Sequence, residues 1–149
     1  MSDYTIVTLE QQHTAVVKST VGMADMPKAE RSARATIANA LPQLNAGPVG
    51  DSFTLCRAAG DGKMHYQPGV IVAQTFEPIG TVIPSQLPAG RAVKHLLIGP
   101  FDLLPQAWPA LFSWCSSEGL ELEGTFWQVY GPPSADPTEQ KTTLFALLS

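Results

Sequence analysis

The strongest constraint on the fold is a pattern of strand, glycine, helix, glycine and strand that occurs twice. Gly22 and Gly99 each follow a predicted strand and precede a helix that begins near an aspartate, while Gly50 and Gly124 each open the strand after that helix. Such a repeat predicts two similar halves around one core. We therefore expect an α+β fold of two pseudo-symmetric βαββ modules, with the helices on one side of antiparallel sheets and a central trough on the other.

Each half contains one amphipathic segment that predicts a helix. From Met26, apolar residues recur every three or four positions, whereas Lys28, Glu30, Arg31 and Arg34 fall on the other side of that helix. The second helix follows a Gly-Pro-aromatic turn, and its wide apolar face includes two tryptophans. We expect Trp127, on the next strand, to pack in the core against this second helix.

Runs of β-branched residues predict the strands. They are Tyr4–Leu9, His13–Thr20, Ser52–Cys56, Met64–Ala73 with an interruption at Pro68-Gly69, Ala92–Ile98, Thr125–Tyr130 and Thr142–Leu148. Residues 57–63 predict a polar turn, and three prolines in Phe76–Ala89 favour a linker. We expect residues 1–149 to form one domain, with halves at about 1–76 and 89–149 and a linker at 77–88.

Composition excludes several classes of protein. The net charge of −4, with basic residues scattered singly, argues against direct nucleic acid binding. No apolar run approaches the roughly 20 residues of a membrane span, and MSDYTIVTLEQQ lacks the features of a secretory signal. Cys56 and Cys115 stand far apart and form no metal motif. We expect a cytoplasmic protein with reduced thiols, no metal, no cofactor and no membrane association.

One long run of residues carries a resemblance to a known family. GPFDLLPQAWPALFSWCSSEGLELEG, followed by a strand that ends in Tyr130 and by the Asp136-Pro137 loop, resembles the GyrI-like effector-binding domain, with its SOUL/GyrI-like fold. Such domains follow the DNA-binding part of several AraC- and MerR-type regulators and also occur alone. The resemblance implies two βαββ modules around a pocket for amphipathic or cationic aromatic molecules. Because the first strand begins near Tyr4, we expect a stand-alone form.

The resemblance also indicates the polarity of the pocket. The family usually carries acids at the positions that match Gln128 and Thr143, and both are neutral here. A buried cation without a counter-charge is costly, so we expect a neutral or weakly polar aromatic ligand. Strand alternation places Gln128 and Tyr130 on one face, away from Trp127 and Val129. The predicted ligand-binding residues are Phe101, Gln128, Tyr130, Thr143, Phe145, Thr54 and Cys56.

Three functions stay open. The first is a small-molecule binding protein that acts as a sensor or sequesters its ligand. The second is a hydrolase that opens strained electrophilic rings, because some stand-alone relatives resemble such enzymes. Because neutral side chains stand at positions 128 and 143, that activity would need another acid, such as Glu77 or Glu123, and we assign no catalytic residue. The third is a protein-interaction module, since the namesake of the family inhibits DNA gyrase.

Overall fold

The structure is a computed structural model that describes residues 3–149. Within that range one antiparallel sheet contains nine strands in the order β1-β7-β9-β8-β4-β5-β2-β6, with β3 paired to β5 beside β2. The elements are β1 (Tyr4–Leu9), β2 (Gln12–Val16), β3 (Ser19–Gly22), η1 (Met23–Asp25), α1 (Met26–Ala40), η2 (Leu41–Gln43), β4 (Val49–Gly60), β5 (Lys63–Val72), β6 (Ile83–Leu87), β7 (Gly90–Ile98), η3 (Phe101–Leu103), α2 (Leu104–Ser117), β8 (Leu122–Tyr130), η4 (Pro137–Glu139) and β9 (Lys141–Leu148).

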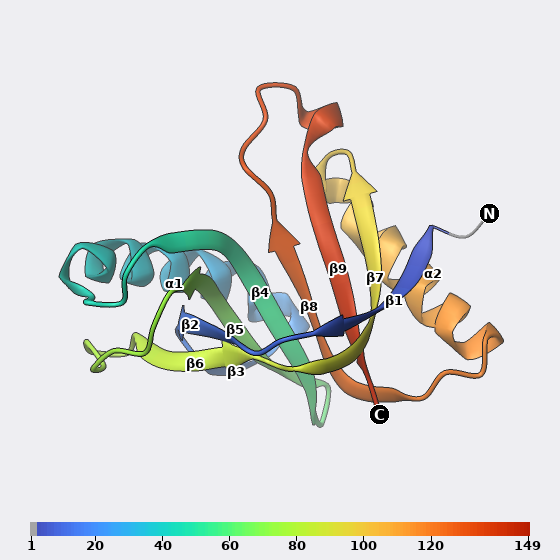
Figure 1. Cartoon of the computed structure of the whole chain (residues 1–149), viewed down its shortest axis with the longest axis horizontal. Coiled ribbons are helices and arrows are strands. Elements are labelled where there is room, and N and C mark those ends of the chain that lie inside the picture. Colours follow the sequence, from blue (N-terminus) through green and yellow to red (C-terminus); the bar gives the residue numbers. More distant parts are fainter. Residues whose placement is uncertain (1–2) are drawn as a thin grey trace.

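The internal repeat is visible in the order of the elements. One half contains β3, α1, β4 and β5, and the other contains β7, α2, β8 and β9. The halves meet where β4 pairs with β8, at the centre of the sheet (Figure 1). The α+β fold with two βαββ modules and one main helix per half is therefore confirmed. The first strand, β1, crosses over to pair with β7 of the second half, so the halves are joined at more than one place.

Both helices cover the same face of the sheet, which we call the helix face (Figure 1). Ile37 and Ala40 of α1 pack with Val70 and Val72 of β5 in one apolar cluster. Leu111 and Cys115 of α2 pack with Val93, Leu144 and Ala146 in another. Among residues 3–149, no helix has the length and the apolar character needed to cross a membrane.

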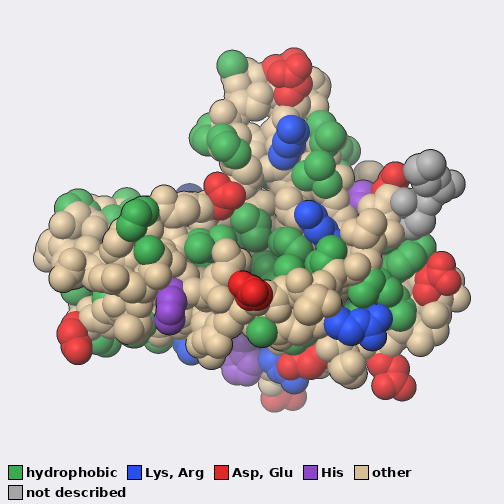
Figure 2. All heavy atoms as spheres, in the orientation of Figure 1, with side chains coloured by type: hydrophobic (Ala, Val, Ile, Leu, Met, Phe, Trp, Pro, Cys, Tyr) green, Lys and Arg blue, Asp and Glu red, His purple; other side chains and the backbone are tan. Residues whose placement is uncertain are grey.

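The other side of the sheet, the helix-free face, has a core of its own. Its buried residues are Val16, Phe53, Leu55, Leu87 and Trp127, with Leu9, Phe145 and others packed around them. Hydrophobic side chains are visible over the middle of this side of the molecule in Figure 2. The sequence analysis predicted the trough on this side of the sheet. These side chains fill its middle, so the helix-free face has no open trough at its centre.

Trp127 belongs to this helix-free face, which corrects the expectation that it packs against α2. Its indole is 2% exposed and stacks on Phe145, with ring centroids 5.3 Å apart and planes 19° from parallel. The predicted alternation along β8 is confirmed, because Gln128 and Phe126 point to the helix face instead.

Strand β5 is continuous where an interruption was predicted. Pro68 pairs with Thr54 on β4, and its carbonyl accepts a hydrogen bond from the Val17 amide on the other side, at 3.2 Å. The missing amide proton of Pro68 therefore falls at the break between β2 and β3, where the ladder is already interrupted. Gly69 fits because a Cβ there would lie 2.6 Å from Val16 and 2.7 Å from the Ala15 carbonyl oxygen.

Two other predicted boundaries were wrong. The β4–β5 hairpin reverses at Asp61 and Gly62 alone, with φ of 53° and 72°, so most of the predicted turn at residues 57–63 is strand. This left-handed Asp-Gly pair is typical of two-residue hairpin loops. The predicted linker at 77–88 contains β6, which pairs with β2 from Gln12↔Leu87 to Val16↔Ile83. Pro84 is tolerated there because β6 is an edge strand.

Candidate ligand-binding site

Helix α1 contributes a carboxylate and a guanidinium to the helix face. Glu30 and Arg34 stand one helical turn apart, and Arg34 Nε donates to Glu30 Oε1 at 2.8 Å. Both side chains are 26% exposed. Glu30 precedes Ala33 and Ile37 at three- and seven-residue intervals, so it continues the buried stripe of the helix. The prediction that both charges lie on the outer side of the helix was wrong.

Arg34 ties α1 to the central strands. Its Nη1 donates to the Gly69 carbonyl oxygen at 2.7 Å, and its Nη2 donates to the Phe53 carbonyl oxygen at 2.5 Å. The guanidinium carbon also lies 5.7 Å from the centroid of the Tyr130 ring. A guanidinium can make these bonds together because its donors form a planar fork. Arg34 therefore fixes the position of Glu30 above the sheet.

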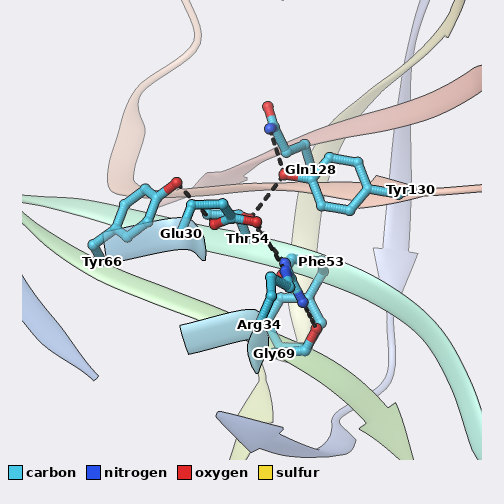
Figure 3. Close-up of polar contacts among 8 residues, drawn as sticks. All are labelled: Glu30, Arg34, Phe53, Thr54, Tyr66, Gly69, Gln128 and Tyr130. Atoms are coloured by element: carbon cyan, nitrogen blue, oxygen red, sulfur yellow. Dashed lines mark hydrogen bonds and ion pairs between the residues drawn. The ribbon is translucent and has the colours of Figure 1, made fainter. Parts of the chain in front are cut away.

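A chain of hydrogen bonds joins α1 to α2 across the sheet, and Figure 3 shows the part of it that runs from Glu30 on α1 to Gln128 on β8. The Tyr66 hydroxyl donates to Glu30 Oε2 at 3.0 Å, and the Thr54 hydroxyl lies 3.3 Å from the same oxygen. Thr54 Oγ1 is 2.8 Å from the Tyr130 hydroxyl, which accepts from Gln128 Nε2 at 2.8 Å. At the far end, Trp108 Nε1 on α2 donates to Gln128 Oε1 at 2.8 Å. We call these six residues the polar chain.

An open cleft of about 320 Å³ lies along this polar chain. Its apolar wall comes from Phe101 and Leu104, at the start of α2, and from the ring of Tyr130. Phe101 is 51% exposed and meets Tyr130 edge to face, with centroids 5.7 Å apart. The polar wall comes from Glu30, Arg34 and Gln128. The cleft thus combines aromatic surface with a carboxylate, a guanidinium and an amide.

Burial raises the pKa values of the two phenols of the site further above neutral pH. The pKa of Tyr66 is raised by burial and by the nearby Glu30 carboxylate, and burial raises the pKa of Tyr130. Both phenols are therefore hydrogen-bond donors at neutral pH.

Cys56 shares the helix face with Thr54, as predicted, and its pKa is raised to about 12 by burial and by Glu30. At pH 8 its thiol is therefore protonated and poorly nucleophilic. Both cysteines are buried. A colorimetric thiol reagent should accordingly titrate no thiol in the folded protein and two after denaturation. Fast reaction of one thiol in the folded state would contradict this reading.

Four of the predicted site residues lie at the cleft or in the polar chain, whereas Cys56 does not line the cleft. Gln128 and Tyr130 belong to both, Phe101 lines the cleft, and Thr54, which is 3% exposed, belongs to the polar chain.

Thr143 and Phe145 do not reach this cleft, which corrects the predicted site. Gln128 pairs with Leu144, so Thr143 and Phe145 pair with Val129 and Trp127 on the helix-free face. Cross-strand partners share a face, and Phe145 packs in the cluster around Trp127. The alternation along β9 was sound, but its phase relative to β8 depends on the pairing register, which the periodicity of one strand cannot show.

Sequence reasoning also missed residues that the structure brings to the site. Glu30, Arg34, Tyr66, Leu104 and Trp108 line the cleft or belong to the polar chain. A usable signal existed only for Glu30, a charge on the apolar stripe of α1. Among residues 3–149, no group of three or more His, Cys, Asp or Glu side chains could hold a metal ion.

Comparisons with known proteins agree with this fold. The chain is similar to the EcmrR C-terminal domain, with a TM-score of 0.78, 18% identity, and coverage of 98% of this chain and 96% of that one. It is similar to SAV2435 bound to tetraphenylphosphonium, with a TM-score of 0.75, 14% identity, and coverage of 98% and 93%. It is also similar to a hydrolase encoded by lin2189 from Listeria innocua, with a TM-score of 0.59, 14% identity, and coverage of 98% and 91%. At these identities the likeness shows a shared fold.

The search of curated proteins found no match. A family model, described as the GyrI-like small molecule binding domain, matches residues 2–145. That match includes all the residues that line the cleft and both βαββ modules except the last three residues of β9. The chain therefore belongs to the GyrI-like small molecule binding domain family.

Proposed function

We propose that this protein binds a neutral aromatic small molecule in the cleft beside Tyr130, as a sensor or as a sequestering protein. The observation that carries the proposal is an open aromatic cleft whose only lining carboxylate, among the described residues, is already paired. Glu30 is held by Arg34 at 2.8 Å, so the two formal charges of the cleft cancel. The whole of residues 1–149 would act as one effector-binding domain.

The polarity of the cleft supports a neutral ligand. An organic cation would lose its hydration shell and would meet the Arg34 guanidinium as well as the Glu30 carboxylate. The neighbour SAV2435 was solved with tetraphenylphosphonium, a cation. We expect a neutral ligand here instead, because an acid with its own arginine partner offers less attraction to a second cation. The net charge of −4, with no basic stripe, fits a cytoplasmic protein that makes no direct contact with nucleic acid.

Changing Tyr130 to alanine should weaken binding of a neutral aromatic ligand by about 1–2 kcal/mol, because its ring supplies burial and stacking. The measurement is isothermal titration with quinolin-2-one, which is neutral and planar. Tyr130→Phe keeps the ring and is the matched control, and it should lose less affinity than Tyr130→Ala. Equal affinity of the natural protein and Tyr130→Ala would mean that the Tyr130 ring does not contact the ligand.

A hydrolase is the second candidate, and one observation favours it. The Glu30 carboxylate lies in an open cleft, and the Tyr66 hydroxyl donates to it at 3.0 Å. A carboxylate so placed could accept a proton from a water molecule that attacks a strained electrophilic ring, while a phenol protonates the leaving carbon. The Arg34 ion pair weighs against this reading, since it stabilises the ionised carboxylate.

Mass spectrometry separates the two candidates. The protein is incubated with an arene-fused cyclopropane, and the small molecules are recovered. An unchanged compound that raises the melting temperature supports binding alone. A water adduct that is lost in Glu30→Gln would instead establish turnover.

A further inference from the structure

We propose that the direction of the polar chain selects the ligand: Gln128 presents an N–H donor and Glu30 presents an acceptor, so the cleft takes a neutral aromatic ring that carries both a hydrogen-bond acceptor and a hydrogen-bond donor. Gln128 is the specificity-determining residue, and Trp108 is a positioning residue that acts through it. This inference rests on the proposed function and names the class of ligand at the same cleft.

Trp108 fixes the orientation of the Gln128 amide. An indole N–H can donate a hydrogen bond but cannot accept one. The Gln128 atom that lies 2.8 Å from Trp108 Nε1 must therefore be the oxygen. The amide nitrogen then faces the Tyr130 hydroxyl at 2.8 Å. The Gln128 amide could otherwise rotate by 180°, and these two hydrogen bonds hold its nitrogen toward Tyr130, which lines the cleft.

The remaining bonds all run toward Glu30. Among the described residues, the acceptor within reach of the Tyr130 proton is Thr54 Oγ1, at 2.8 Å, because the amide nitrogen of Gln128 cannot accept. Thr54 has a single hydroxyl proton, which is free to donate to Glu30 Oε2 at 3.3 Å. Each donor from Trp108 onward thus points in the same sense, and bonds in such a series polarise one another.

This direction of the hydrogen bonds leaves one donor and one acceptor of the cleft available to a ligand. Gln128 Nε2 carries two protons, and one of them is used by Tyr130. The Glu30 carboxylate offers about four lone-pair sites, of which Arg34, Tyr66 and Thr54 occupy some. A ligand that accepts a hydrogen bond from Gln128 and donates one to Glu30 would use this remaining hydrogen-bonding capacity of both side chains. A cation with no acceptor would leave the amide proton without a partner, which is unfavourable in a desolvated cleft.

Three bicyclic probes of similar size test the selection. Quinolin-2-one has a carbonyl acceptor beside an N–H donor, N-methylquinolin-2-one keeps only the acceptor, and N-methylquinolinium is a cation with neither. Their dissociation constants are measured by isothermal titration. We expect quinolin-2-one to bind tightest and each lost hydrogen bond to weaken binding by about tenfold.

Variants then assign the effect to residues. Trp108→Phe keeps an aromatic ring against Phe112 and Phe126 but removes the indole donor. The freed amide can turn its oxygen to the cleft, so the preference for quinolin-2-one over N-methylquinolinium should fall by about fivefold. Trp114→Phe is the matched control, because Trp114 is on the same helix as Trp108 but stacks on Tyr4 of β1, with ring centroids 5.0 Å apart, and does not line the cleft. It should leave that preference unchanged.

Gln128→Glu gives an independent test that does not require Trp108→Phe to fold. It places a second carboxylate in the cleft, and the preference should reverse toward N-methylquinolinium. A ligand-free readout is the indole N–H proton resonance of Trp108, which should move upfield in Gln128→Leu while that of Trp114 stays in place.

The outcomes separate the inference from the proposed function. If the natural protein binds the three probes within twofold of one another, the inference is overturned and the aromatic cleft stands. An unchanged preference in both Trp108→Phe and Gln128→Glu would overturn it in the same way. If none of the probes binds, the proposed function fails and the inference fails with it.

Discussion

Replacing Trp127 with alanine should lower the free energy of unfolding by about 4 kcal/mol, which would be among the largest effects of any single change in this chain. The indole is 2% exposed and stacks on Phe145 within the cluster of the helix-free face. Its removal loses that burial and leaves a cavity between β4, β8 and β9. Urea denaturation followed by far-ultraviolet circular dichroism measures the change.

Two controls make this result informative. Trp127→Phe keeps an aromatic ring on Phe145 and should cost about 1–2 kcal/mol. Because Trp127 lies on the face opposite the cleft, its alanine variant should bind quinolin-2-one with the affinity of the natural protein at a temperature where both are folded. A loss of stability below about 1 kcal/mol would mean that the helix-free face is not a packed core.

Replacing Arg34 with methionine should lower the free energy of unfolding by about 3 kcal/mol, although the side chain is partly exposed. Methionine retains the apolar stem, but the carbonyl oxygens of Phe53 and Gly69 and the Glu30 carboxylate all lose a charged donor. Phe53 is 1% exposed, so water cannot readily replace the lost bond. The same denaturation experiment measures the effect.

Arg31→Met is the matched control for that experiment. Arg31 is exposed on the same helix, and its replacement should change stability by no more than about 0.5 kcal/mol. Arg34→Lys should recover only part of the loss, because an ammonium cannot span Glu30 and two carbonyl oxygens as a planar fork does. Full stability in Arg34→Lys would mean that charge alone, and not the fork, holds α1 on the sheet.

Phe101 should contribute mainly to ligand affinity, whereas the buried aromatic side chains Trp127 and Phe53 should contribute mainly to stability. Phe101 is half exposed and borders the cleft, whereas Trp127 and Phe53 are enclosed. A change at Phe101 should therefore alter affinity more than stability, and changes at Trp127 or Phe53 on the helix-free face should do the reverse. This contrast follows from the single sheet, which separates an apolar core on one face from a polar site between two helices on the other.

The amino-acid pattern was enough to predict the elements that repeat. The period of α1, the Gly-Pro-aromatic turn before α2 and the alternation along β8 are properties of short segments, so they can be recognised without knowledge of neighbours. The face shared by Gln128 and Tyr130 follows from that alternation. The continuity of β5 through Pro68 could not be predicted, because it depends on a break between β2 and β3 that lies opposite.

By itself, then, the sequence determined the α+β class, the duplicated modules, the family and the faces of individual strands. Only the tertiary structure decided that Leu144, rather than Thr143, lies across from Gln128 on the helix face, and that Glu30 and Arg34 join the cleft from α1. The physical reason is that periodicity is local, whereas pairing register and helix docking depend on contacts between distant segments. The site of this protein is built from such contacts, with Trp108 and Glu30 joined through β4 and β8.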